Sequence, residues 1–161
     1  MLYRKFGNTG IDVSVLGFGA MRLPFTVKDG KNVYDYEESA RIMQRANELG
    51  VNYFDTAPGY CDLESEAIVG QALKDIRSKV YISTKYYDEN DSGRDCRKGI
   101  EQSLKQLGTS YIDFYHMWGI NLDYFETKLS VPGARLMKPQ KQRMRDLFGI
   151  FRFHFTTMPK T

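Results

Sequence analysis

Four side chains that can carry acid–base chemistry follow short apolar runs in this sequence. The runs cover residues 51–54, 80–84 and 111–115, and the four side chains belong to Asp55, Tyr60, Lys85 and His116. Three of these residues come directly after a run, and Tyr60 lies five residues beyond Asp55, after a Pro-Gly turn. The chemistry open to such a set is proton donation to a carbonyl oxygen.

A role can be assigned to each member of the set. Tyrosine is a weak acid at neutral pH, and the Lys85 ammonium would stabilise its phenolate. Asp55 would orient Lys85 and keep it charged, while neutral His116 would hydrogen-bond the substrate oxygen. Because no side chain delivers a hydride, a nicotinamide cofactor would be required. Alternatively, Asp55 caps the next turn and Tyr60 is one of 11 tyrosines on a surface. The occurrence of three ionisable types at successive strand ends favours the functional interpretation.

The elements that must position these residues alternate along the chain. Residues 2–15 predict a hairpin, and a strand then extends to Ala20-Met21-Arg22, followed by a polar loop over 24–33 with a turn at Asp29-Gly30. Helices are predicted over 35–49, 63–75 and 94–107. Asp35 and Glu38 form a capping box at the start of the first helix, and Gly50 ends it.

This order, a hairpin followed by β-α-β-α-β-α-β, implies a parallel sheet with its functional residues along one rim. An open doubly wound sheet and a (β/α)8 barrel both fit this order. A nucleotide-binding fingerprint would need a third glycine after Gly17 and Gly19, but Arg22 stands there and a long loop follows. A barrel is therefore favoured.

The composition sets further bounds on the chain. It has 161 residues, of which 42% are hydrophobic and 27% charged, and this is typical of a globular domain. The sequence contains no apolar run of the length that a membrane span needs, about 20 residues. The start resembles no signal peptide, so a cytoplasmic location is expected. Cys61 and Cys96 lack metal-ligand spacing and are expected to stay reduced, so no metal site is predicted.

Over about residues 2–133 the sequence resembles the aldo-keto reductase family. The resemblance rests on the opening hairpin and on the motifs G-F-G-A-M-R-L-P, N-Y-F-D-T-A-P-G-Y, S-T-K and Y-H-M-W-G. It implies a (β/α)8 barrel that binds NADP(H), or less often NAD(H), and reduces small-molecule aldehydes and ketones. The catalytic tetrad would be Asp55, Tyr60, Lys85 and His116, with Tyr60 as general acid. Residues near the nicotinamide would be Gly19, Ala20 and Met21, together with Asp55. The sequence around His116, H-M-W-G, is most similar to that of a bacterial branch of the family.

Family members are about twice as long as this chain. We therefore expect the N-terminal half of a barrel over residues 1–133 (a hairpin and four βα units, the last helix incomplete) and an irregular basic tail over 134–161. The tail holds seven Lys and Arg and a single acidic residue, Asp146. We interpret it as the product of truncation or of a frameshift after about residue 133, so it implies neither a nucleic-acid nor a membrane partner.

Two functions follow from this interpretation. The chain is an inactive piece of an NADP(H)-dependent carbonyl oxidoreductase, or it is a non-catalytic half-barrel that serves as an interaction or assembly module. A half-barrel would leave a sheet edge open, through which copies could associate.

Overall fold

The structure is a computed structural model that describes residues 1–86, 96–119, 122–124 and 126. The basic tail expected over 134–161 lies outside the described residues. The truncation or frameshift expected after about residue 133 lies outside them as well. The predicted alternation of strands and helices and the four candidate catalytic residues all lie within them.

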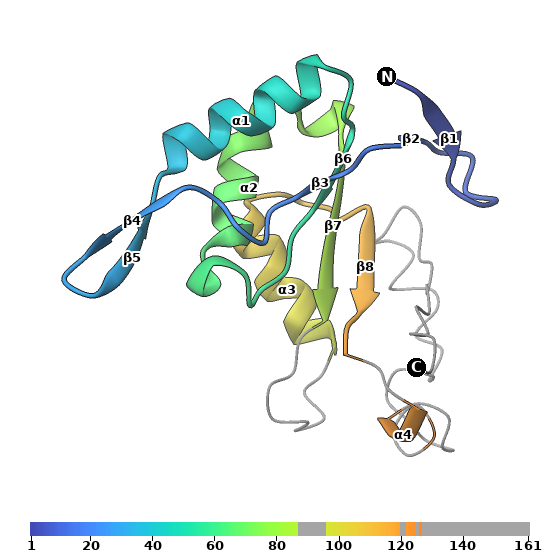
Figure 1. Ribbon diagram of the computed structural model, residues 1–161. Helices are drawn as coiled ribbons and strands as arrows, with labels where there is room; N and C mark the ends of the chain where they lie inside the picture. Colours follow the sequence, from blue (N-terminus) through green and yellow to red (C-terminus); the bar gives the residue numbers. More distant parts are fainter. Residues whose placement is uncertain (87–95, 120–121, 125, 127–161) are drawn as a thin grey trace, which may run out of the picture.

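The centre of the fold is a four-stranded parallel sheet (Figure 1). Its strands, in spatial order, are β3 (Phe18–Gly19), β6 (Tyr53–Asp55), β7 (Tyr81–Tyr86) and β8 (Phe114–Met117). The helices α1 (Tyr36–Glu48), α2 (Ser65–Leu73) and α3 (Cys96–Leu107) connect successive strands and lie on one side of the sheet. A short helix, α4 (Leu122–Tyr124), follows β8. The predicted order of parallel strands and crossover helices is confirmed.

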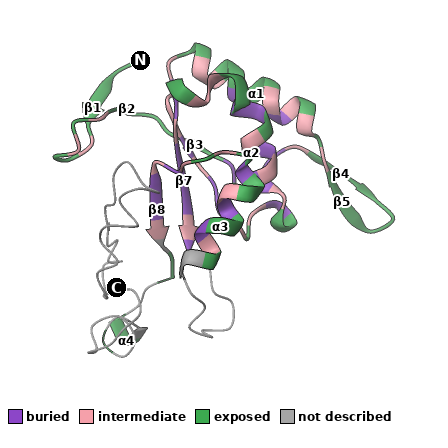
Figure 2. Ribbon diagram, turned by 180° about the vertical axis from the view of Figure 1, so that it is seen from behind, coloured by how far each residue is buried: buried purple, intermediate pink, exposed green. Residues whose placement is uncertain are grey.

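Alternation along the strands gives the sheet two different faces. Phe54 and Ile82 are paired across β6 and β7, and both are fully buried beneath the helices. The neighbouring pair, Asp55 and Ser83, points to the opposite, inner face, because successive side chains of a strand alternate. The buried positions concentrate on β7, β8 and the helix sides that cover them (Figure 2). The largest fully buried side chains of the core are Phe54, Met43, Ile68, Leu73, Ile82, Ile100 and Ile112.

The region predicted as a polar loop over 24–33 is instead a β-hairpin. Strands β4 (Phe25–Lys28) and β5 (Lys31–Tyr34) pair antiparallel across the predicted Asp29-Gly30 turn. Both turn residues have positive φ, 50° and 73°, as a tight two-residue hairpin requires. The turn prediction is therefore confirmed and the loop prediction is wrong, because β-branched and aromatic residues, which favour strands, occur on both sides of the turn.

The first two predicted helices are present, and they differ from the predictions at their ends. The Asp35 Oδ1 atom accepts a hydrogen bond from the Glu38 amide at 2.8 Å, so the predicted N-cap of α1 is confirmed. The other half of the predicted capping box is wrong, because the Asp35 amide donates to the Pro24 carbonyl at 2.8 Å. Gly50, which follows this helix, has φ 96°. The helix predicted over about residues 63–75 is confirmed as α2 (Ser65–Leu73), which is two residues shorter at each end. The short 3₁₀ turn η1 (Cys61–Leu63) precedes it, and the 3₁₀ segment η2 (Lys74–Lys79) follows it.

The N-terminal hairpin, β1 (Tyr3–Lys5) and β2 (Asp12–Ser14), covers the end of the sheet where the strands begin (Figure 1). The Asn52 side chain, just before β6, accepts from the Ser14 amide at 2.7 Å and donates to the Asp12 carbonyl at 3.0 Å. The Phe6 ring, in the hairpin turn, packs on Phe114 with ring centroids 4.6 Å apart. The hairpin therefore covers the inner face of the sheet at the end where Phe114 lies.

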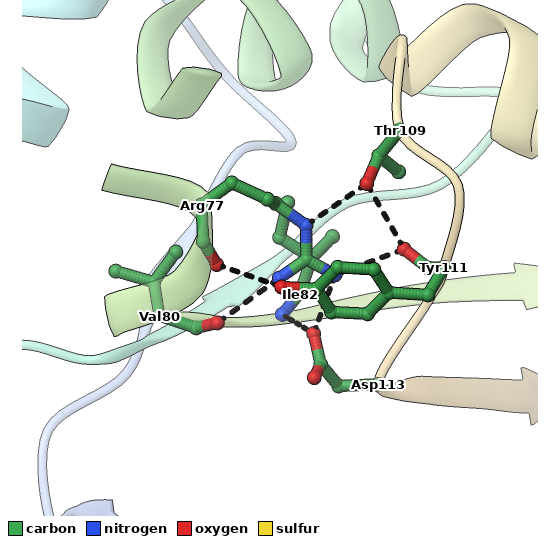
Figure 3. A network of polar contacts seen from close by, with 6 residues as sticks. All are labelled: Arg77, Val80, Ile82, Thr109, Tyr111 and Asp113. Atoms are coloured by element: carbon green, nitrogen blue, oxygen red, sulfur yellow. Dashed lines mark hydrogen bonds and ion pairs between the residues drawn. The ribbon is translucent and has the colours of Figure 1, made fainter. Parts of the chain in front are cut away.

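A partly buried ion pair joins the segments that lead into β7 and β8 (Figure 3). Arg77 Nη2 lies 2.7 Å from Asp113 Oδ2, and the two side chains are 13% and 16% exposed. The guanidinium also donates to the carbonyl oxygens of Val80 at 3.0 Å and Tyr111 at 2.9 Å. Asp113 Oδ2 accepts a further hydrogen bond from the Ile82 amide at 2.9 Å. The cluster therefore ties β8 to β7 in the register that places His116 opposite Lys85.

No helix within the described ranges is long and apolar enough to cross a membrane. The same residues contain no group of three His, Cys, Asp or Glu side chains arranged to hold a metal ion.

Candidate active site

Asp55 and Lys85 form an ion pair on the inner face of the sheet. Asp55 is the last residue of β6, and Lys85 is the last but one of β7. The Lys85 Nζ atom lies 2.6 Å from Asp55 Oδ2 and donates to the Thr56 carbonyl at 2.7 Å. The other carboxylate oxygen of Asp55 accepts from the Ser83 hydroxyl at 2.9 Å. The Lys85 side chain is only 12% exposed, so the orientation of its ammonium is held by protein contacts.

Tyr60 lies next to this pair. The Lys85 ammonium stands over the Tyr60 ring, 4.7 Å from its centroid. Such a cation–π contact holds the ring and the positive charge together. Trp118, two residues after His116, packs edge-on against the same ring, with centroids 6.1 Å apart. Tyr60 therefore lies between the ends of β7 and β8, as the alignment of strand ends predicted.

His116 stands beside Lys85 on the neighbouring strand, because the two residues are register partners. Its Nε2 atom is 3.3 Å from the Tyr53 hydroxyl. Burial raises the pKa of Tyr53, and the charges of Asp55 and Asp113 raise it further, against a lowering hydrogen bond from Ser83. The phenol therefore stays protonated at neutral pH, and its hydroxyl lies within hydrogen-bond distance of the His116 ring.

The structure thus brings all four predicted catalytic residues to one end of the sheet. Three of them, Asp55, Lys85 and Tyr60, are in direct contact. Sequence reasoning missed Tyr53 and Ser83, which precede Asp55 and Lys85 by two residues and therefore share their face. The period of two along each strand could have identified them.

The backbone directly after Tyr60 is left-handed. Cys61, Asp62 and Leu63 have φ values of 51°, 51° and 78°. For residues other than glycine this conformation costs roughly 1–2 kcal/mol each. The Cys61 side chain is buried, and its Sγ lies 3.5 Å from the carbonyl oxygens of Ala20 and Met21. Tertiary contacts therefore stabilise the turn that carries the phenol.

The residues predicted to lie near a nicotinamide occupy the neighbouring strand end. Gly19 is paired with Asp55 across β3 and β6, and a Cβ placed on it would meet nothing within 4 Å. Met21 is exposed, whereas Ala20 is fully buried and donates its amide to the Asp55 carbonyl at 2.8 Å. The open surface at Gly19, beside Asp55 and Met21, would accept the flat ring of a nicotinamide.

A second carboxyl lies behind the site, on the helix side of β7. Glu66 of α2 is 2% exposed, and its Oε1 accepts from the Thr84 hydroxyl at 2.6 Å. Burial raises its pKa, while the hydrogen bond from Thr84 and the charge of Lys85 partly oppose the shift. Thr84 immediately precedes Lys85, so Glu66 fixes the strand at the point where it presents the ammonium.

Because the pKa of Glu66 is raised, the contribution of this residue to the free energy of unfolding falls as the pH rises. Between the unfolded value of about 4.5 and the higher folded value, the folded chain binds more protons than the unfolded chain. Raising the pH through this window therefore costs folding free energy, and Glu66→Gln should abolish that part of the pH dependence. Urea unfolding of both proteins from pH 4 to pH 8 measures it. A stability difference between them that does not change with pH would contradict the assignment.

Comparisons with known proteins agree with this geometry. The family profile described as "Aldo/keto reductase family" matches residues 15–131. The L-galactose dehydrogenase of Arabidopsis thaliana is 32% identical over 154 residues, which cover 91% of this chain and 47% of that protein. The sequence relationship extends well beyond the motifs around the four site residues.

Solved structures show the same fold. An aldo-keto reductase from Bacillus halodurans, in its holo form, superposes with a TM-score of 0.73 and 27% identity over 95% of this chain and 50% of that chain. An aldo/keto reductase from Klebsiella pneumoniae, solved with NADP and acetate, has a TM-score of 0.56 and 24% identity, covering 66% of this chain and 35% of that one. The chain therefore has the fold of a partial (β/α)8 barrel, and it spans half or less of the length of these relatives.

Proposed function

The chain belongs to the aldo/keto reductase family, and from this premise we propose that it carries the proton-donating half of an NADP(H)-dependent carbonyl reductase site. The observation that supports this most directly is the position of the Lys85 ammonium between Asp55 and Tyr60. Its Nζ atom lies 2.6 Å from Asp55 Oδ2 and 4.7 Å from the centroid of the Tyr60 ring. The relatives include a dehydrogenase and a reductase solved with NADP, which favours redox chemistry and this cofactor.

In the proposed reaction Tyr60 gives its hydroxyl proton to the oxygen of an aldehyde or ketone. A reduced nicotinamide, when bound, supplies the hydride that the carbonyl carbon needs. Loss of the proton leaves a phenolate, which the adjacent Lys85 ammonium stabilises. Asp55 holds Lys85 charged and in place, and water returns the proton to Tyr60 after each turnover.

His116 has a different part in this proposal. Its position opposite Lys85 in the β7–β8 register would let the imidazole orient the substrate oxygen toward the Tyr60 hydroxyl. The Tyr53 hydroxyl, 3.3 Å from Nε2, would hold the imidazole ring in this orientation. Gly19 and Met21, with Asp55, are the residues that would lie against the nicotinamide. We place this chemistry in the cytoplasm, with a small carbonyl compound as substrate and with no nucleic acid or membrane as partner.

The 161-residue chain by itself is expected to show no measurable NADPH oxidation with aldehydes. The four described strands of the parallel sheet correspond to half of an eight-stranded barrel. The remaining contacts to the nicotinamide would come from the other half. Joining residues 1–119 to the complementary half of the Bacillus halodurans reductase should create the activity. An absorbance assay at 340 nm measures both proteins. Turnover by the 161-residue chain alone would contradict this expectation.

A second candidate function is an assembly module without catalysis. Among the described strands, β3 pairs with one neighbour only, and the open edge of a parallel sheet is a template for association. Sedimentation velocity of the 161-residue chain over a range of concentrations distinguishes the candidates. Reversible association together with an inactive, well-folded chimera would favour the assembly module over the reductase.

A further inference from the structure

The hairpin β4–β5 is joined to the loop that carries Tyr60. Asn32 Nδ2 donates to Asp62 Oδ2 at 2.8 Å, and the Tyr34 hydroxyl donates to the same oxygen at 3.1 Å. Asn32 and Tyr34 are two residues apart on β5 and therefore lie on one face of the hairpin. Asp62 thus receives two hydrogen bonds from one strand, and it lies two residues beyond the proposed general acid.

The loop between β6 and α2 is held separately at its two ends. The hydroxyls of Thr56 and Ser65 are 2.7 Å apart, and Ser65 also donates to the Ala20 carbonyl at 2.8 Å. These contacts are buried and close the base of the loop without Asp62. The bonds from Asn32 and Tyr34 act only on its middle, where the left-handed backbone leads away from Tyr60.

The chemistry of Asp62 suits this position. Aspartate tolerates the left-handed conformation better than most residues, because its short polar side chain can hydrogen-bond locally. Burial and the hydrogen bond to Asp62 both raise the pKa of Tyr34, so its hydroxyl remains a donor at neutral pH. The backbone of the turn returns to Tyr60 as well, because the amides of Leu63 and Ser65 donate to the Tyr60 carbonyl at 3.1 Å and 3.3 Å.

We propose that Asp62 is a positioning residue for Tyr60, and that the β4–β5 hairpin is the anchor through which it acts. Rigid attachment of the turn to Asn32 and Tyr34 keeps the Tyr60 ring between the Lys85 ammonium and Trp118. A catalytic role for Asp62 rests on the proposed function. The positioning of Tyr60 by Asp62 is a property of the folded chain and can be measured without turnover.

Trp118 provides the measurement, because it is the single tryptophan of the chain and packs edge-on against Tyr60. Its indole is 46% exposed, so acrylamide quenching and near-ultraviolet circular dichroism report on whether the Tyr60 ring still covers it. The experiment compares Asp62→Ala with Asp62→Asn in the 161-residue chain, and Tyr60→Ala shows the full effect of removing the ring.

The matched control is Asp29→Ala. Asp29 is an exposed aspartate with φ 50°, almost the value of Asp62, and it lies in the turn of the same hairpin, away from the Tyr60 loop. Its replacement imposes the same backbone strain without removing the contact to the loop. Thermal unfolding of every variant shows how far each change affects stability alone.

We expect Asp62→Ala to shift the quenching constant and the aromatic dichroism most of the way to the Tyr60→Ala values. Asp62→Asn, which keeps an acceptor oxygen and tolerates the same φ, should remain close to the wild type, as should Asp29→Ala. An Asp62→Ala variant that loses stability but keeps the wild-type Trp118 signals would overturn the proposal, and so would an equal shift in Asp29→Ala. Neither result bears on whether the complete site reduces carbonyls, so the two proposals fail separately.

Discussion

Replacing Tyr60 by phenylalanine in the chimeric barrel is expected to lower the rate of carbonyl reduction by about 10²–10⁴-fold, the usual contribution of a positioned general acid. The substitution removes only the hydroxyl, so the ring can keep its contacts with the Lys85 ammonium and with Trp118. The loss should therefore appear in kcat, with little change in cofactor affinity. Steady-state kinetics with NADPH and an aldehyde, together with a fluorescence titration of NADPH, measure both quantities.

Tyr3→Phe is the control for this prediction. It likewise removes a tyrosine hydroxyl, here from an exposed residue of the N-terminal hairpin, where that hydroxyl donates to the Gly50 carbonyl at 2.8 Å. The rate should remain close to that of the unmodified chimera. Equal rates in the Tyr60→Phe and Tyr3→Phe variants would show that Tyr60 is not the proton donor.

Replacing Asp113 by alanine is expected to lower the free energy of unfolding by about 1.5–3 kcal/mol, because the partly buried Arg77 charge loses its hydrogen-bonded partner. The Arg77 guanidinium is 13% exposed and would lose its counter-ion, while the Ile82 amide would lose its acceptor. A whole domain is stable by only about 5–15 kcal/mol, so this single change would remove a large part of the total. Urea unfolding followed by circular dichroism measures the loss.

The exposed Arg45–Glu48 pair at the end of α1 is the matched comparison. Its side chains are 66% and 63% exposed, and Glu48→Ala should cost about 0–1 kcal/mol because water screens such pairs. Similar losses in the two variants would show that the cluster around Arg77 is a surface feature with no special part in holding β8 to β7.

Much of the fold could be predicted from local patterns. Asp35 and Glu38 marked the start of the first helix because a capping residue acts over three positions. Apolar runs marked β6, β7 and β8 to within a few residues, and parallel strands place their ends on one rim of a sheet. Asp55, Lys85 and His116 therefore lie side by side in the structure, as their positions after successive runs indicated.

Predictions were wrong where contacts distant in sequence outweigh local preference. Nothing in the run Cys61-Asp62-Leu63 indicates a left-handed backbone, and the predicted helix began at its last residue. The conformation depends on burial of Cys61 against the 20–21 segment and on hydrogen bonds from β5 to Asp62. The hairpin that supplies these bonds was itself interpreted as a loop, because its polar residues outnumber its apolar ones.

The sequence by itself determined the family, the order of the elements and the types of side chain at the strand ends, since these follow from periods of two and 3.6 residues and from motifs of contiguous residues. Only the tertiary structure decided which of these side chains touch. The Lys85 ammonium lies over the Tyr60 ring, Tyr53 faces His116, and Asp62 is bonded to β5. Each of these contacts joins residues at least 25 positions apart, and such distances are set by sheet register and packing rather than by neighbours along the chain.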